Sequence, residues 1–420
     1  MKKLLGLEIR HILKMRSTLA TFAILCLAAI GVAVISSYGE TAFRLKQDGT
    51  GERLSGIAAQ KEIRMADTEG VLSEERLLEV FRKQRPLFDR YGLYPPEEVF
   101  VKEVFPDNRI LRILSSVYRK EDGSYDPAFL GKLTEADILD FYERRGEMIR
   151  KHYAGSYGEG SVVYEKVMRE ESRVSTPFPY YTFSGWPNAL QNLGALLGIL
   201  VFLSALLLTA QFSGNYQNGA DAIYRTTRYG RRELALARFL AAALVSCLCY
   251  VLLISLYTGL SVAFFGKNGL KAPVQLFDAY AVKPYVVGQV YVRLVLMGAL
   301  TLTAMLAVSM YLAARIQSRV YAMSLVLALL LLPAVLGGDP GPAAVSLSGM
   351  RRPAVRRTGV LRGAAGNGLL CVRKLCGMVS GHDSGGGGRK HPGLGASGGK
   401  ILCASSGKQM TMSKSPKGLH

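Results

Sequence analysis

Five uncharged stretches divide this chain, and the charge-rich residues 39–188 separate the first stretch from the other four. The stretches run from Ser17 to Gly39, Pro187 to Ala220, Phe239 to Gly266, Leu294 to Ala314 and Val320 to Gly338. A helix needs roughly 20 apolar residues to cross the hydrocarbon core of a bilayer, and there its backbone must satisfy its own hydrogen bonds. The sequence therefore predicts an α-helical multi-pass membrane protein with five transmembrane helices. The first would comprise residues 17–38, and residues 189–338 would hold the other four.

Basic residues set the predicted orientation of these spans. Five of them precede the first span: Lys2, Lys3, Arg10, Lys14 and Arg16. Positively charged segments remain on the cytoplasmic side, so the N-terminus and residues 212–238, which hold five arginines, are predicted to be cytoplasmic. A basic start also precedes secretory signal peptides, but Ile35-Ser36-Ser37-Tyr38 is a poor cleavage site, which favours an uncleaved anchor. The positive charge lies beside the spans and in the tail, which argues for membrane orientation and lipid contact, and against nucleic acid as a partner.

Residues 39–188 are predicted to form a mostly helical extracytoplasmic domain. Ser73 can cap a helix that ends at Gly92, and the sequence from Thr134 to Asp137 fits a capping box at the start of a second helix. A third helix is expected over residues 161–171. The domain has no cysteine, so it must fold on its own core without disulfides.

Residues 1–16 are predicted to form an amphipathic helix at the cytoplasmic membrane surface. Its apolar face would consist of Leu5, Ile9, Ile12 and Leu13. The alternative is a simple cytoplasmic extension of the first span.

Two features flank the start of the second span. Residues 177–187 are aromatic and include Trp186, which is typical of a belt at the membrane interface. Gly194 and Gly198 form a pair of small residues that would allow close helix contact.

Residues 339–420 differ from the rest of the chain. They contain clustered arginines and a glycine run from Gly385 to Gly388, with no uncharged stretch long enough to span a membrane. This composition predicts either a disordered tail or a frameshifted reading.

No motif for catalysis, metal binding or nucleotide binding occurs in the sequence. Gly399-Lys400 and Gly407-Lys408 both fail the phosphate-binding pattern G-x-x-x-x-G-K-[ST], and there is no H-E-x-x-H, no G-x-S-x-G and no zinc-ligand spacing. The middle of each predicted span lacks Asp, Glu, Lys and Arg. Proton- and ion-coupled carriers usually need such a residue, so the spans argue against self-energised transport.

Residues 212–238 resemble the cytoplasmic loop of type-2 ABC transporter permeases. In that family a phenylalanine ends the second span, a polar-tyrosine-glycine segment follows, and a Gly-Arg pair with a Leu-x-x-Ala-basic run opens the third. The matching residues here are Phe212, Tyr216, Gly219, Gly230, Arg231, Leu234, Ala237 and Arg238. The chain departs from the family at Asn215, where many members carry glutamate, and in having five predicted spans where the family has six.

The resemblance implies a bacterial exporter-type permease subunit in the plasma membrane, with a large external domain after its first span. Such a subunit is not itself an enzyme and holds no cofactor, because a separate ABC ATPase binds ATP and Mg²⁺. A second permease subunit would complete the pathway. The loop residues implied to contact the ATPase are Tyr216, Gly219, Asp221, Gly230, Arg231, Arg232 and Arg238. Two other classes remain open: a membrane-anchored sensor or interaction protein, and a channel or secondary carrier.

Overall fold

Long apolar helices dominate the computed structural model, which describes residues 2–46, 51–119, 126–217, 233–316 and 318–336. Within these residues, four helices are long and apolar enough to cross a membrane. They are α2 (Arg16–Ser37), α10 (Trp186–Gln217), α12 (Glu233–Phe265) and α13 (Val287–Arg315). Leu27, Leu248 and Leu300 on these helices are 69%, 54% and 64% exposed. Leucines exposed along helices of this length indicate a membrane-embedded protein, as the sequence predicts.

The fifth predicted span coincides with α14 (Arg319–Leu336). This helix is shorter than the other four, and its apolar part within the described residues is Val320–Leu329. Its role as a fifth span therefore remains a prediction. The predicted tail, residues 339–420, lies outside the described residues.

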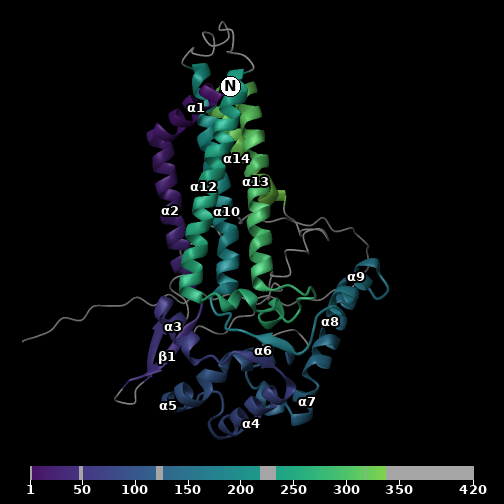
Figure 1. The fold of residues 1–420 in the computed structure, drawn as a ribbon. Coiled ribbons are helices and arrows are strands. Elements are labelled where there is room, and N and C mark those ends of the chain that lie inside the picture. Colours follow the sequence, from purple (N-terminus) through teal and green to yellow (C-terminus); the bar gives the residue numbers. More distant parts are fainter. Residues whose placement is uncertain (1, 47–50, 120–125, 218–232, 317, 337–420) are drawn as a thin grey trace, which may run out of the picture. The chain divides into compact units, whose positions relative to one another are not determined.

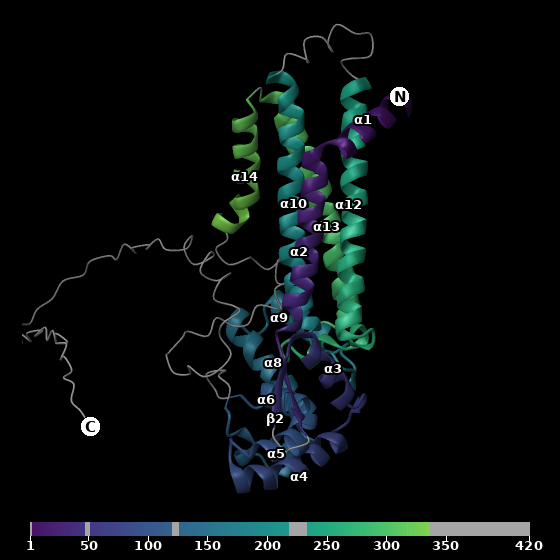
Figure 2. The same ribbon diagram turned by 90° about the vertical axis from the view of Figure 1, so that its left-hand side faces the viewer.

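Helix α10 contacts each of the other apolar helices, and α2, α10, α12 and α13 run side by side (Figures 1 and 2). Leu193, Leu196 and Leu200 recur along one face of α10 and are almost completely buried. The opposite face carries Gly194 and Gly198, where an added Cβ would meet no other atom within 4 Å. Among the described residues, no helix therefore makes the predicted close contact with this glycine pair.

A domain of mixed secondary structure is inserted between α2 and α10, and we call it the inserted domain. Its helices are α3 (Gly56–Ala66), α4 (Glu74–Tyr91), α5 (Glu97–Val99), α6 (Asn108–Val117), α7 (Glu135–Leu139), α8 (Phe141–Tyr157) and α9 (Val162–Glu171). Shorter helical turns are η1 (Phe100–Val104), η2 (Phe105–Asp107) and η3 (Phe129–Lys132). The domain is mostly helical, as predicted.

The two predicted capping signals are present, and the third predicted helix corresponds to α9. The Ser73 hydroxyl accepts a hydrogen bond from the Arg76 amide, and α4 ends before Gly92, whose φ is +64°. Thr134 and Asp137 form the predicted capping box, and Ser161 caps α9. The helix after Thr134 is interrupted at Asp140, however, so the single predicted helix is two helices, α7 and α8.

Two small antiparallel sheets complete the inserted domain, and the sequence did not predict them. Strand β1 (Thr41–Leu45) pairs with β2 (Gly51–Ser55), and Thr41 faces Ser55. Strand β3 (Gly70–Leu72) pairs with β4 (Phe178–Tyr180), and Leu72 faces Phe178. The second sheet therefore joins the two ends of the domain across more than a hundred residues.

The aromatic segment before α10 lies inside the protein. Phe178, Tyr180, Phe183 and Trp186 are at most 7% exposed. The Trp186 ring packs edge-on against Phe265 and Tyr291, with centroid distances of 5.9 and 6.2 Å. The predicted belt facing the membrane interface is therefore wrong for these residues. They instead join the inserted domain and the helices in one hydrophobic core.

The α12–α13 turn (residues 266–286) also packs against the inserted domain. It contains the turns η4 (Asn268–Lys271) and η5 (Val274–Leu276). The indole Nε1 of Trp186 donates to the Gly266 carbonyl at 3.1 Å, and the Asn268 amide donates to Glu69 at 3.0 Å. We call the ends of α12 and α13 that adjoin this turn their domain ends.

Candidate functional site

The first candidate site is the contact between α1 (Lys2–Lys14) and the start of α12. Helix α1 corresponds to the surface helix predicted at residues 1–16, and it packs against α12, whose first turns contain the end of the predicted cytoplasmic loop at residues 212–238. Ile12 is 5% exposed, and Leu5 and Ile9 pack against the same core. Leu13 is predicted to lie on this face but is 41% exposed, so the buried face is narrower than the predicted one.

A salt bridge ties this contact together. The Arg238 guanidinium lies 3.2 Å from the Glu8 carboxylate, and both side chains are only 17% exposed. Residues separated by 230 positions thus hold the N-terminal helix against α12. Arg238 is the member of the predicted ATPase-contact set whose side chain the structure describes, and it is engaged inside the chain.

The other predicted contact residues are only partly covered. Tyr216 falls in the last turn of α10. Gly219, Asp221, Gly230, Arg231 and Arg232 lie outside the described residues.

Polar side chains connect the candidate spans near the inserted domain. The Asn192 amide on α10 donates to the Ser36 hydroxyl on α2 at 2.8 Å, and the Tyr257 hydroxyl on α12 donates to the Ala189 carbonyl at 2.9 Å. Thr258 and Tyr291 link α12 to α13 through their hydroxyls at 2.6 Å. Apolar packing alone holds helices weakly in lipid, so such bonds fix which helices associate. The sequence contains no spacing that identifies this set.

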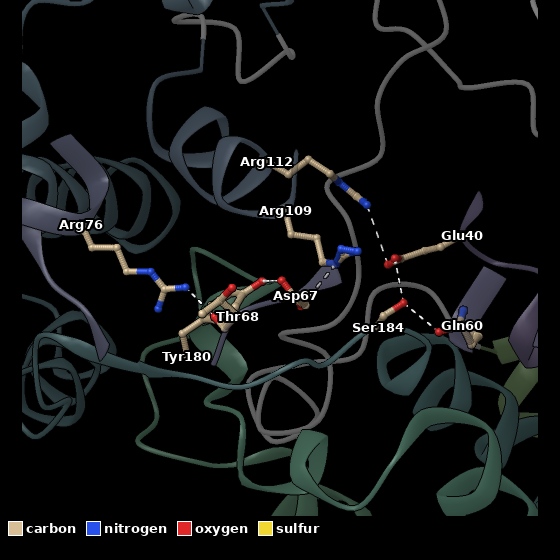
Figure 3. A network of polar contacts seen from close by, with 9 residues as sticks. All are labelled: Glu40, Gln60, Asp67, Thr68, Arg76, Arg109, Arg112, Tyr180 and Ser184. Carbon is tan, nitrogen blue, oxygen red and sulfur yellow. Dashed lines mark hydrogen bonds and ion pairs between the residues drawn. The ribbon is translucent and has the colours of Figure 1, made fainter. Parts of the chain in front are cut away.

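A second polar network lies where the inserted domain meets the candidate spans (Figure 3). Ser184 donates to Glu40 at 2.9 Å and approaches Gln60 at 2.8 Å, and the Gln60 amide donates to the Ser37 carbonyl at the end of α2. Arg112 extends from α6 toward Glu40, at 3.7 Å. This network ties α3, α6 and the segment before α10 to the last turn of α2.

Asp67 is the most deeply buried carboxylate in this network. Its side chain is 2% exposed, accepts a hydrogen bond from the Tyr180 hydroxyl at 2.7 Å and lies 3.5 Å from Arg109. Within the part of the chain that the structure describes, neither facing atom of that ion pair, Asp67 Oδ2 or Arg109 Nε, makes a hydrogen bond. Burial raises the pKa of the Asp67 carboxyl above its ordinary value, and the Arg109 guanidinium opposes this shift. Burial likewise raises the pKa of the Tyr180 hydroxyl.

This arrangement fits structural pairing better than catalysis. Asp67 is enclosed by Arg109 and Tyr180, so it does not face open solvent where a substrate could bind. Among the described residues, no group of three or more His, Cys, Asp or Glu side chains could hold a metal ion.

A half-open cavity of about 170 Å³ lies in the inserted domain between α4, α6 and η3. Its lining is largely apolar and includes Phe88 and Leu130. Its polar lining residues are Gln84, Asn108 and Arg112, none of which is a usual nucleophile or general acid or base. Gln84 donates to the Glu103 carbonyl and to Asp107, and Arg112 approaches Glu40. The cavity therefore presents no group poised for chemistry.

Comparisons of this chain with protein-family models, with curated proteins and with solved structures find no match.

Proposed function

We propose that this chain is the transmembrane permease subunit of an ATP-driven exporter in the bacterial plasma membrane. In this proposal a separate ABC ATPase binds ATP and Mg²⁺ and docks on the α1–α12 contact and on the loop at residues 212–238. Closure of the ATPase then changes the packing of the candidate spans. A second permease subunit lines the other half of the pathway, and the inserted domain lies at its external end.

The α1–α12 contact is the observation that supports this proposal most directly. An externally driven membrane subunit needs a site that receives force and passes it to its spans. Helix α1 packs on α12, with Ile12 buried in the core, and is fixed by the Glu8–Arg238 salt bridge, so a displacement of α1 acts on a candidate span. The absence of a phosphate-binding motif in the sequence agrees with an energy source in another subunit.

Charge reversal in the loop tests the proposal. The affinity-tagged chain, expressed in its own host, should co-purify with an ATPase that carries a phosphate-binding Walker motif. The double variant Arg231→Glu/Arg232→Glu should still insert in the membrane but lose that ATPase, because an interface charge is reversed.

The matched control is Arg351→Glu/Arg352→Glu, which makes the same charge change in the tail and should retain the ATPase. If the ATPase stays bound to the loop variant, or if none co-purifies with the unmodified chain, the proposal is wrong.

A further inference from the structure

The α12–α13 turn is held by a buried arginine of the inserted domain. Arg145 projects from α8, and its side chain is only 2% exposed. One terminal nitrogen donates to the Ala281 carbonyl in the turn at 2.8 Å, and the other donates to Glu171 on α9 at 2.5 Å. The guanidinium also lies over the Phe178 ring at 5.3 Å. A single side chain therefore connects α8, α9, β4 and the turn.

Aromatic contacts surround this connection. Tyr280 precedes Ala281, and its ring lies 4.6 Å from the His152 ring on α8. The Tyr153 hydroxyl approaches the Tyr280 carbonyl at 3.4 Å, and Arg119 lies 5.8 Å from the Tyr280 ring. The turn is thus held at two successive residues. Tyr280 is contacted through its ring and its carbonyl, and Ala281 through its carbonyl.

The hydrogen bonds of the Arg145–Glu171 ion pair are incomplete. Arg145 Nε and Glu171 Oε2 are buried and make no hydrogen bond with any described residue. Burial also raises the pKa of the Glu171 carboxyl above its ordinary value, and the Arg145 guanidinium opposes this shift. A buried ion pair with unmet hydrogen bonds gains less than a fully satisfied one, so its release costs less.

We propose that Arg145 is a latch between the inserted domain and the α12–α13 turn. While it is closed, the turn and the inserted domain move as one body, and displacement of α12 or α13 is carried into the inserted domain. Opening of the domain ends of these helices requires Arg145 to release Ala281. The proposal does not depend on what the chain transports or on whether an ATPase drives it.

Distance measurements between spin labels test the latch. Labels are attached at Arg150→Cys on α8 and Lys271→Cys on the turn, both exposed positions, in the full chain with its six native cysteines replaced and reconstituted in lipid nanodiscs. The latch-free variant is Arg145→Met/Glu171→Met, which removes both charges so that neither remains buried alone. Double electron-electron resonance should give one narrow distribution of label-to-label distances when Arg145 and Glu171 are present. The latch-free variant should give a broader or bimodal distribution.

Arg144→Met is the matched control, because Arg144 is next to Arg145 on α8 but its side chain is 61% exposed. Its ion pair with Glu147 is long, at 4.0 Å. It should leave the distribution narrow. Arg145→Lys keeps a positive charge beside Glu171 but replaces the planar fork, whose two terminal nitrogens bind Glu171 and Ala281, by a single nitrogen. It should broaden the distribution in the same direction, which keeps the test valid if the double variant fails to fold. Unchanged distributions in the folded latch variants would overturn the proposal.

Discussion

At the scale of single residues, the buried ion pair of Asp67 and Arg109 has the clearest energetic consequence. Both side chains are at most 6% exposed, and their facing atoms lie 3.5 Å apart without a hydrogen bond. Such a pair contributes little over a well-packed apolar replacement, but the loss of one partner leaves a charge buried alone.

Arg109→Met should therefore destabilise the inserted domain strongly. Removing one partner of a buried ion pair costs about 3–5 kcal/mol. The exposed Arg44–Glu62 pair supplies the control, since Arg44→Met removes a solvent-screened ion pair and should destabilise the domain much less. Thermal unfolding followed by circular dichroism measures both. Equal effects of the two substitutions would contradict the buried pairing.

Asp67 also predicts a pH dependence of stability. Because burial raises its pKa above the ordinary 3.8, the folded protein keeps this proton to a higher pH than the unfolded chain does. Its contribution to the free energy of unfolding is thus fully present below pH 3.8 and is lost as the pH rises through the folded-state pKa.

In melting experiments over this pH range, the stability of the wild-type protein relative to Asp67→Asn should fall as the pH rises. Asp89→Asn, on an exposed carboxylate, serves as the control. A wild-type advantage that grows with pH would contradict the assignment.

At the scale of elements, helix α1 is defined by its contact with α12 and not by amphipathicity alone. Leu5, Ile9 and Ile12 face the core as the helical period predicts, whereas Leu13 does not. The four-residue apolar set predicted from the sequence is wider than the surface that α12 offers.

Ile12→Ala should consequently destabilise this contact, while Leu13→Ala should change it little. Truncation of a buried isoleucine typically costs about 2–5 kcal/mol, and Leu13 is 41% exposed. The two neighbouring substitutions remove similar side chains from one helix, and the difference in melting temperature between them isolates burial. A larger effect of Leu13→Ala would mean that α1 packs through another face.

Local sequence signals predicted some elements of the inserted domain and missed others. The caps at Ser73 and Thr134 were readable because the capping hydrogen bonds span only three residues. The β3–β4 pair was not, since each strand has three residues and its partner is remote in sequence. The same holds for the polar network, where Tyr180 and Asp67 are 113 residues apart. The burial of Trp186 was missed because an aromatic segment beside a span has the same composition whether it faces lipid or protein.

At the scale of the whole molecule, segregation of charged and uncharged residues determined most of the architecture. Four of the five predicted spans correspond to helices long and apolar enough to cross a membrane, and the inserted domain follows the first of them. Hydropathy succeeds here because a spanning helix must meet its requirements within one continuous segment.

The orientation of the spans in the membrane gives a prediction for the whole molecule. In intact cells that express a cysteine-free background, Gly123→Cys in the inserted domain should react with a membrane-impermeant thiol reagent. Asn218→Cys should react only after permeabilisation, because the basic loop around it is predicted to be cytoplasmic. The reverse pattern would invert the topology and remove the basis for ATPase docking.

Trp186 is the only tryptophan in the chain, and it lies at the junction of α10, α13 and the α12–α13 turn. The protein thus contains an intrinsic fluorophore at the point where the inserted domain joins the helices. Its indole is fully enclosed, so its emission should be blue-shifted at rest and move to longer wavelength when water enters the junction. Opening of the domain ends could then be followed in real time, in unlabelled protein.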